Sequence, residues 1–131
     1  MDEEREEQLV NDMEQFSAEQ LPFDLSTGDF SAFRPRTIFI ALEPNALLPL
    51  IQQRFTDFLM AKNYPVKKDK RPFHPHITIA TRDLRKKAFS EAWPYFTGKQ
   101  FRAQWRAEGI SLLAHNKKNW DVVHTSQFKN I

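Results

Sequence analysis

The sequence of 131 residues contains no cysteine, three glycines and no long apolar run. The absence of cysteine excludes disulfides, thiolate nucleophiles and thiolate metal sites, and it fits a cytoplasmic protein. Three glycines, at positions 28, 98 and 109, cannot form a glycine-rich phosphate loop or a dinucleotide fingerprint. No apolar stretch approaches the roughly 20 residues that a membrane span needs. The N-terminal stretch MDEEREEQ is acidic, unlike a signal or transit peptide. We therefore expect a cytoplasmic protein that does not enter a membrane.

The composition is that of one folded domain over residues 1–131. Apolar residues make up 40% of the chain and include twelve phenylalanines, which is enough to build a core.

Charge divides the chain into two parts. Residues 1–20 carry eight acids and one base, a net charge of −7, whereas residues 21–131 carry nine acids and eighteen bases, a net charge of +9. The basic body suggests an anionic partner, with nucleic acid first; the alternative is an ordinary solvated surface.

Hydrophobic spacing predicts an α+β fold with antiparallel pairing. The expected elements are an acidic helix (3–20), strands at 23–33 and 36–42, a helix at 46–62, a basic proline-containing loop (63–75), a strand at 76–82, a basic helix (84–93), strands within 100–115, and a last strand at 120–128. Leu9, Met13 and Phe16 fall on one stripe of the first helix, which is expected to pack on the sheet. Gly28 and Asp29 indicate a bulge or a turn. Asn45 is a candidate N-cap of the second helix, and Pro94 is expected to end the third. The buried side of the second helix is expected to carry Leu47, Leu50, Ile51, Phe55, Phe58 and Leu59. The hairpins near the C-terminal end favour antiparallel sheets over a doubly wound parallel sheet.

The strand at 76–82 places an imidazole and a hydroxyl together. Side chains two residues apart share a face of a strand, so His76 and Thr78 point one way. Ile77 and Ile79 point the other way and are expected to lie in the core. An imidazole can give or take a proton near neutral pH, and a hydroxyl can donate to a phosphate oxygen. This pair therefore suits phosphoryl chemistry. The alternative is that the pair has no function and that a half-exposed strand carries two polar residues by chance.

The stretch RPFHPHITIATRDL (71–84) resembles the second H-Φ-T-Φ motif of the 2H phosphoesterase superfamily, in particular its bacterial 2′-5′ RNA ligase-like (cyclic phosphodiesterase) proteins. The resemblance covers most of residues 23–128. It implies a two-lobed antiparallel α+β fold in which each lobe contributes one such strand to a central cleft. His76 would then be a catalytic histidine and Thr78 a phosphate-binding hydroxyl, with Arg82 near the substrate.

The same resemblance implies a mechanism without metal or other cofactor. One histidine activates water or a 2′-hydroxyl, and a second protonates the leaving oxygen of a 2′,3′-cyclic phosphate or a 2′-5′ phosphodiester, at an RNA end or on a nucleotide. The sequence has one H-Φ-T-Φ motif, because neither His115 nor His124 fits the pattern. We therefore expect this chain alone to be weak or inactive as an enzyme.

Three explanations of the single motif stay open: a chain that lacks the N-terminal strands of the fold, a reduced protein, or a dimer that pairs two His76 strands. The alternative function is a non-catalytic module that binds RNA or a nucleotide phosphate. A third hypothesis is an α+β interaction domain in which the H-x-T spacing arose by chance.

Residues before the motif complete the predicted site. Phe73 is the best candidate to stack on a base, and Arg71 belongs to a basic run (67–71) that could steer an RNA end. His74 and His76 do not predict a metal centre, because two ligands are too few and Pro75 separates them. The predicted site is therefore His76 and Thr78 as catalytic residues, with Arg82, Phe73 and Arg71 as substrate-binding residues.

Overall fold

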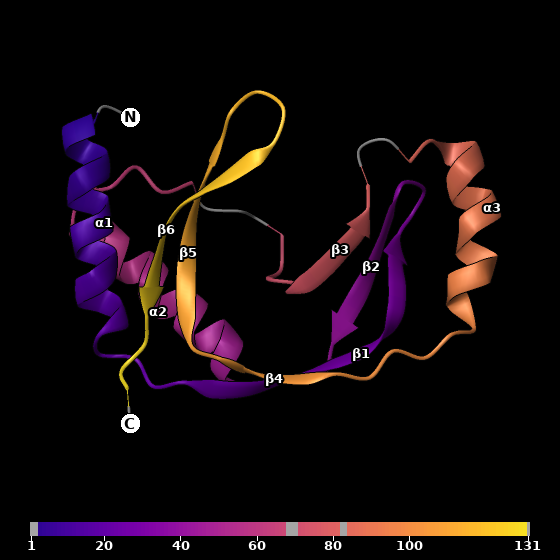
Figure 1. Cartoon of the computed structure of the whole chain (residues 1–131), viewed down its shortest axis with the longest axis horizontal. Helices are drawn as coiled ribbons and strands as arrows, with labels where there is room; N and C mark the ends of the chain where they lie inside the picture. Colours follow the sequence, from indigo (N-terminus) through magenta and orange to yellow (C-terminus); the bar gives the residue numbers. More distant parts are fainter. Residues whose placement is uncertain (1–2, 68–70, 82–83, 131) are drawn as a thin grey trace.

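The computed structural model describes residues 3–67, 71–81 and 84–130 (Figure 1). Along the chain its elements are α1 (Glu3–Ser17), β1 (Phe23–Phe33), β2 (Thr37–Leu42), α2 (Leu47–Ala61), β3 (His76–Ala80), α3 (Lys86–Thr97), β4 (Gln104–Ala107), β5 (Gly109–His115) and β6 (Trp120–Gln127). The predicted order of helices and strands is confirmed.

Strand β1 joins two lobes. Its first half pairs with β4 and its second half with β2, and the register shifts between Thr27 and Phe30, where the bulge was predicted. The sheet order is β3-β2-β1-β4, with β5 and β6 forming a separate hairpin, and every pairing is antiparallel. Figure 1 shows α1, α2, β5 and β6 on one side and β2, β3 and α3 on the other, with β1 and β4 running between them. The predicted two-lobed α+β fold is confirmed.

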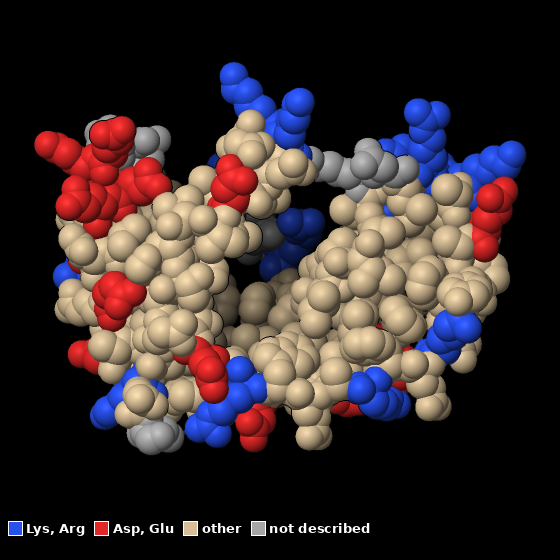
Figure 2. Space-filling model, in the orientation of Figure 1, with Lys and Arg blue, Asp and Glu red and all other residues tan. Residues whose placement is uncertain are grey.

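The first lobe is built on the apolar stripe of the acidic helix. Leu9, Met13 and Phe16 of α1 are buried, as their helical spacing predicted. Leu9 and Met13 pack with Tyr64, which follows α2, and with partly buried side chains of α2 and β5. Because one side of α1 covers this core, its glutamates remain on the outside, and Figure 2 shows them gathered there.

The second lobe is built on β2. Ile38, Phe39 and Ile40 are all buried, and α3 packs on β1 and β2. One anchor of this helix is a ring contact between Phe96 and Phe30 of β1, with centroids 5.0 Å apart. Alternation along β2 sends Phe39 to the opposite face from Ile38 and Ile40. That opposite face carries the predicted site residues His76 and Thr78.

The helix α2 begins as predicted but is less buried than predicted. The Asn45 side-chain oxygen accepts hydrogen bonds from the backbone N–H groups of Leu47 (2.9 Å) and Leu48 (3.1 Å), which makes Asn45 the cap of the first turn. The expectation that Leu47 and Leu50 face the core is wrong, because they are 50% and 43% exposed. They lie in the first turns of the helix, whereas Phe55 and Leu59 further along pack on the core of the first lobe.

Two other expectations are wrong. Ile77 and Ile79 are 39% and 42% exposed rather than buried, because β3 is an edge strand and α3 packs on β1 and β2. Helix α3 does not end before Pro94 but continues to Thr97. Proline costs a helix one backbone hydrogen bond and a steric clash, but Pro94 lies so near the end that most of the helix is unaffected, and the Phe96 contact holds the last turn.

The space-filling view in Figure 2 is hollowed between the two lobes. Lysine and arginine side chains lie near the upper rim of this hollow, on the side away from the acidic helix. Among the described residues, no helix has the length and apolar character needed to cross a membrane.

Candidate functional site

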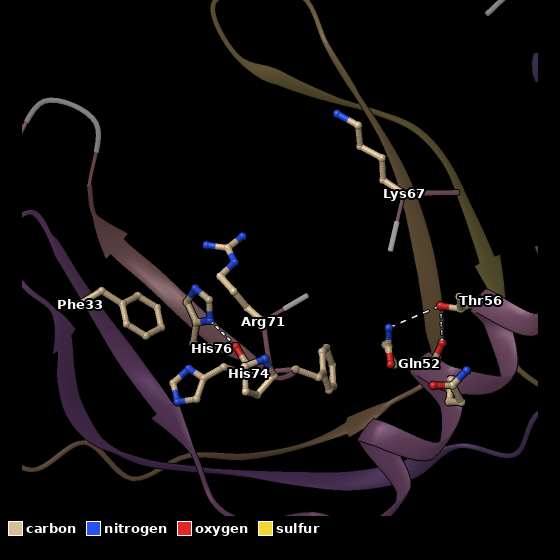
Figure 3. A pocket seen from close by; sticks show the side chains of 10 residues that line it. Phe33, Gln52, Thr56, Lys67, Arg71, His74 and His76 are labelled. Atoms are coloured by element: carbon tan, nitrogen blue, oxygen red, sulfur yellow. Dashed lines mark hydrogen bonds between the residues drawn. The ribbon is translucent and has the colours of Figure 1, made fainter. Parts of the chain in front are cut away.

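A cavity of about 1110 Å³ opens between the lobes and contains most of the predicted site. Its lining combines two histidines, two cations, two phenylalanines and a polar face of α2: Phe33, Gln52, Gln53, Thr56, Lys67, Arg71, Pro72, Phe73, His74 and His76. Figure 3 shows that Phe33, His74, His76 and Arg71 form one side, while Gln52 and Thr56 of α2 form the other. The cavity is therefore bounded by both lobes.

The imidazole of His76 is held by the backbone immediately before it. Its Nδ1 lies 2.6 Å from the carbonyl oxygen of His74. Because a carbonyl can only accept, Nδ1 carries the proton and donates it in this bond. In the neutral ring Nε2 is then the unprotonated nitrogen. His76 is thus oriented to take a proton through Nε2, or to give one when the ring is charged.

Two phenylalanines support the imidazoles from behind. Phe39, which is 1% exposed, lies under both rings, with centroids 5.0 Å from His76 and 5.5 Å from His74. Phe33 meets both rings at 5.1 Å and packs on Phe39 at 4.4 Å. Strand β2 and the end of β1 thereby restrict how the two histidines can turn.

The predicted substrate-binding residues fall in different places. Arg71 and Phe73 line the cavity, and Phe73 is 45% exposed. Thr78 is exposed on β3 and pairs with Phe39 of β2, which places it on the His76 face, but it lies beyond the residues that line the cavity. Arg82 lies outside the described residues. The structure thus brings His76, Arg71 and Phe73 together, with Thr78 further along the same strand face.

Sequence reasoning missed the α2 side of the cavity. Gln52, Gln53 and Thr56 recur at a spacing that puts them on one helical face, yet exposed amides and hydroxyls on a helix resemble an ordinary solvated surface. Phe33 was likewise not distinguishable from a core residue. No local pattern could have identified these residues, because they meet His76 only when α2 folds across from β3.

The two remaining histidines serve elsewhere. His124 on β6 lies 2.6 Å from a carboxylate oxygen of Glu14 on α1. This hydrogen bond from His124 lowers the pKa of Glu14 below its usual 4.5. His115 packs against Trp120 near the hairpin turn, with ring centroids 5.0 Å apart. Neither histidine lines the cavity. Within the described ranges, no three His, Asp or Glu side chains gather as a metal site.

Comparisons with known proteins agree with this architecture. Among solved structures, the crystal structure of a protein named TT0787 from Thermus thermophilus superposes with a TM-score of 0.65 at 19% sequence identity. The match covers 98% of this chain and 73% of that one, and at such low identity it shows the shared fold. No curated protein matches the sequence. The sequence pattern of the 2′-5′ RNA ligase superfamily matches residues 1–119. With most of its length matched by that pattern, the chain belongs to the 2′-5′ RNA ligase superfamily.

Proposed function

We propose that the cavity binds the phosphate of an RNA end or nucleotide carrying a 2′,3′-cyclic phosphate or a 2′-5′ phosphodiester, and that His76 transfers a proton there. The observation that carries this proposal is the oriented imidazole of His76, fixed by its bond to the His74 carbonyl in a cavity that Arg71 and Lys67 also line. Two cations suit a phosphate, whose negative charge they offset.

The proposed chemistry is the hydrolysis of one phosphate ester bond. A water oxygen adds to phosphorus, the bond from phosphorus to one ribose oxygen breaks, and that oxygen leaves with a proton. One group must take the water proton and another must supply the proton to the leaving oxygen. Oriented as it is, His76 can do either, and no metal is needed. In ligation a 5′-hydroxyl takes the place of water: its oxygen adds to the phosphorus of the cyclic phosphate, the bond from phosphorus to the 3′-oxygen breaks, and the 3′-oxygen leaves with a proton.

A non-catalytic binding module is the second candidate, and the positions of the histidines favour it. His115 and His124 lie away from the cavity, so the H-Φ-T-Φ strand has no partner motif among the described residues. We therefore expect binding of the cyclic phosphate with weak turnover or none by a single copy of this chain. A second copy could supply a second His76.

Calorimetry with adenosine 2′,3′-cyclic monophosphate tests the proposal. Wild-type protein is expected to bind it, with an affinity that falls as salt rises because the contact is ionic. Replacement His76→Ala is expected to weaken binding roughly tenfold, the value of one charge-assisted hydrogen bond. The matched control His115→Ala should leave binding unchanged. Equal binding by wild type and His76→Ala would overturn the proposal.

Phosphorus NMR of the same ligand separates the two candidates. Slow hydrolysis that is lost in His76→Ala, at a rate that rises more steeply than in proportion to protein concentration, would indicate catalysis by paired copies. Binding without hydrolysis at any concentration favours the non-catalytic module. Rapid hydrolysis at a rate proportional to protein concentration would contradict the expectation that one copy is weak.

A further inference from the structure

The face of α2 that lines the cavity across from His76 is polar and carries no charged side chain. Helix α2 contributes Gln52, Gln53 and Thr56 to the lining, and the lysine and arginine of the cavity come from the loop instead (Figure 3). Of the two cations, Arg71 lies beside His76, whereas Lys67 lies nearer to α2 (Figure 3). A phosphate is favoured where a guanidinium and a histidine lie together, so it belongs on the Arg71 and His76 side. The amides and hydroxyl face a part of any ligand that is polar and carries no charge.

The amide of Gln52 is held in one orientation. The hydroxyl of Thr56 donates to the backbone carbonyl of Gln52 at 3.0 Å, so its oxygen is left to accept. The Gln52 side-chain nitrogen lies 3.4 Å from that oxygen and donates to it. One N–H and the carbonyl oxygen of the Gln52 amide remain for a ligand. Gln53 differs, because its nitrogen donates to Asp57 at 2.9 Å.

An adjacent donor and acceptor match the edge of a nucleobase. A glutamine amide pairs with adenine, for example, by accepting from its amino group and donating to a ring nitrogen. Phe73 lines the same cavity and is half-exposed, so an aromatic face is available for a base to stack on. The cavity thus offers a site for phosphate on one side and complements an uncharged, flat, hydrogen-bonding group on the other.

We propose that the Gln52–Thr56 face of α2 is a nucleobase subsite, in which Gln52 binds the base edge and Thr56 acts as a positioning residue. The inference rests on the proposed function, since it assumes that a nucleotide phosphate occupies the His76 side. It makes the base of the nucleotide, or the first base of an RNA end, part of what the site recognises in addition to the phosphate.

Calorimetry with two probes tests the subsite: adenosine 2′,3′-cyclic monophosphate, and methyl riboside 2,3-cyclic phosphate, which has no base. Wild-type protein should bind the adenosine compound roughly tenfold more tightly, as expected for base stacking with edge hydrogen bonds. In Gln52→Leu we expect this preference to fall about fivefold while the affinity for the riboside stays unchanged. Thr56→Val should lower the preference less, because the amide is then released but still present.

Control variants separate the possible failures. Gln15→Leu makes the same change on an exposed position of α1, away from the cavity, and should alter neither affinity. His76→Ala should weaken both probes equally. The subsite is overturned if wild type binds the two probes equally, or if Gln52→Leu keeps the full preference. When both probes bind and His76→Ala weakens them, such a result leaves the proposed function intact. If neither probe binds wild type, the proposed function fails first, and the subsite with it.

Discussion

Replacing Tyr64 by phenylalanine removes the hydroxyl that hydrogen-bonds the acidic helix α1 to the segment that follows α2. Tyr64 is 7% exposed, and its hydroxyl donates to a carboxylate oxygen of Asp12 on α1 at 2.6 Å. The guanidinium of Arg5 lies over the same ring, 4.0 Å from its centroid, and also donates to the Asn63 carbonyl. In Tyr64→Phe the ring, its burial and the Arg5 contact all remain, so the change isolates the hydrogen bond.

The expected cost follows from the surroundings of Asp12. A hydrogen bond to a charged group contributes about 1.5–3 kcal/mol, and losing one partner leaves the other poorly solvated. The Asp12 side chain is 13% exposed, and its remaining ion pair, with Lys62, is long at 4.0 Å. We therefore expect the free energy of unfolding to fall by about 2 kcal/mol. For a domain of this size, that is a decrease in melting temperature of about 7 °C.

The effect also has a defined pH dependence. Burial, with the hydrogen bond to Asp12, raises the pKa of Tyr64 to about 12 from its usual 10. Because the folded-state pKa is the higher one, this contribution to stability is complete below about pH 10 and is lost as pH rises through about 12. Phenylalanine does not titrate. The difference between wild type and Tyr64→Phe should therefore narrow over that range.

Urea unfolding at pH 7 and at several alkaline pH values measures both effects. Tyr95→Phe is the matched control, since Tyr95 is 63% exposed on α3, and it should change stability by less than about 0.5 kcal/mol. The reasoning is refuted if Tyr64→Phe costs no more than this control. It is also refuted if the difference from wild type stays constant up to pH 12.

Three further changes have predictable outcomes. Phe39→Ala should lower the free energy of unfolding by about 3–5 kcal/mol in urea, and nucleotide affinity should fall with it, because Phe39 supports His76 from below. Asn45→Ala should cost about 1 kcal/mol by removing the cap of α2, and a variant as stable as wild type would contradict that role. Glu14→Gln should reduce stability above pH 4.5, because the lowered pKa of Glu14 means that its pairing with His124 stabilises the fold above that pH and is lost as pH falls through the folded-state pKa. Thermal melts from pH 3 to 7 should show the melting temperatures of the two proteins converging in acid. A difference in melting temperature that does not depend on pH would rule this out.

The order of elements was predictable because each depends on neighbouring residues. The stripe of Leu9, Met13 and Phe16, the cap at Asn45 and the break at Gly28 are local signals, and all three are confirmed. His76 was predictable for the same reason, since its motif lies within a few residues. Local pattern therefore singled out His76, which lines the candidate cavity.

Tertiary packing decided what the sequence could not show. Alternation predicts which face of the sheet Ile77 and Ile79 lie on, but it does not predict whether another element covers that face. Their exposure therefore depends on where α3 packs. A proline predicts a helix end, but the contact of Phe96 with Phe30 holds the last turn beyond Pro94. Gln52 and Thr56 line the candidate cavity only because α2 lies across from β3.

The edge position of β3 has a consequence for how the site moves. Within the described part of the chain, β3 hydrogen-bonds to β2 alone, so only its inward-facing amides are protected by the ladder. Edge strands open locally at a lower free energy than central ones. The backbone that carries His76 should then exchange its amide hydrogens faster than the backbone of β2. Deuterium uptake by β3 would report how often the strand that positions His76 against Phe39 opens. Slower uptake with bound nucleotide would measure how much the ligand stabilises the strand against this opening.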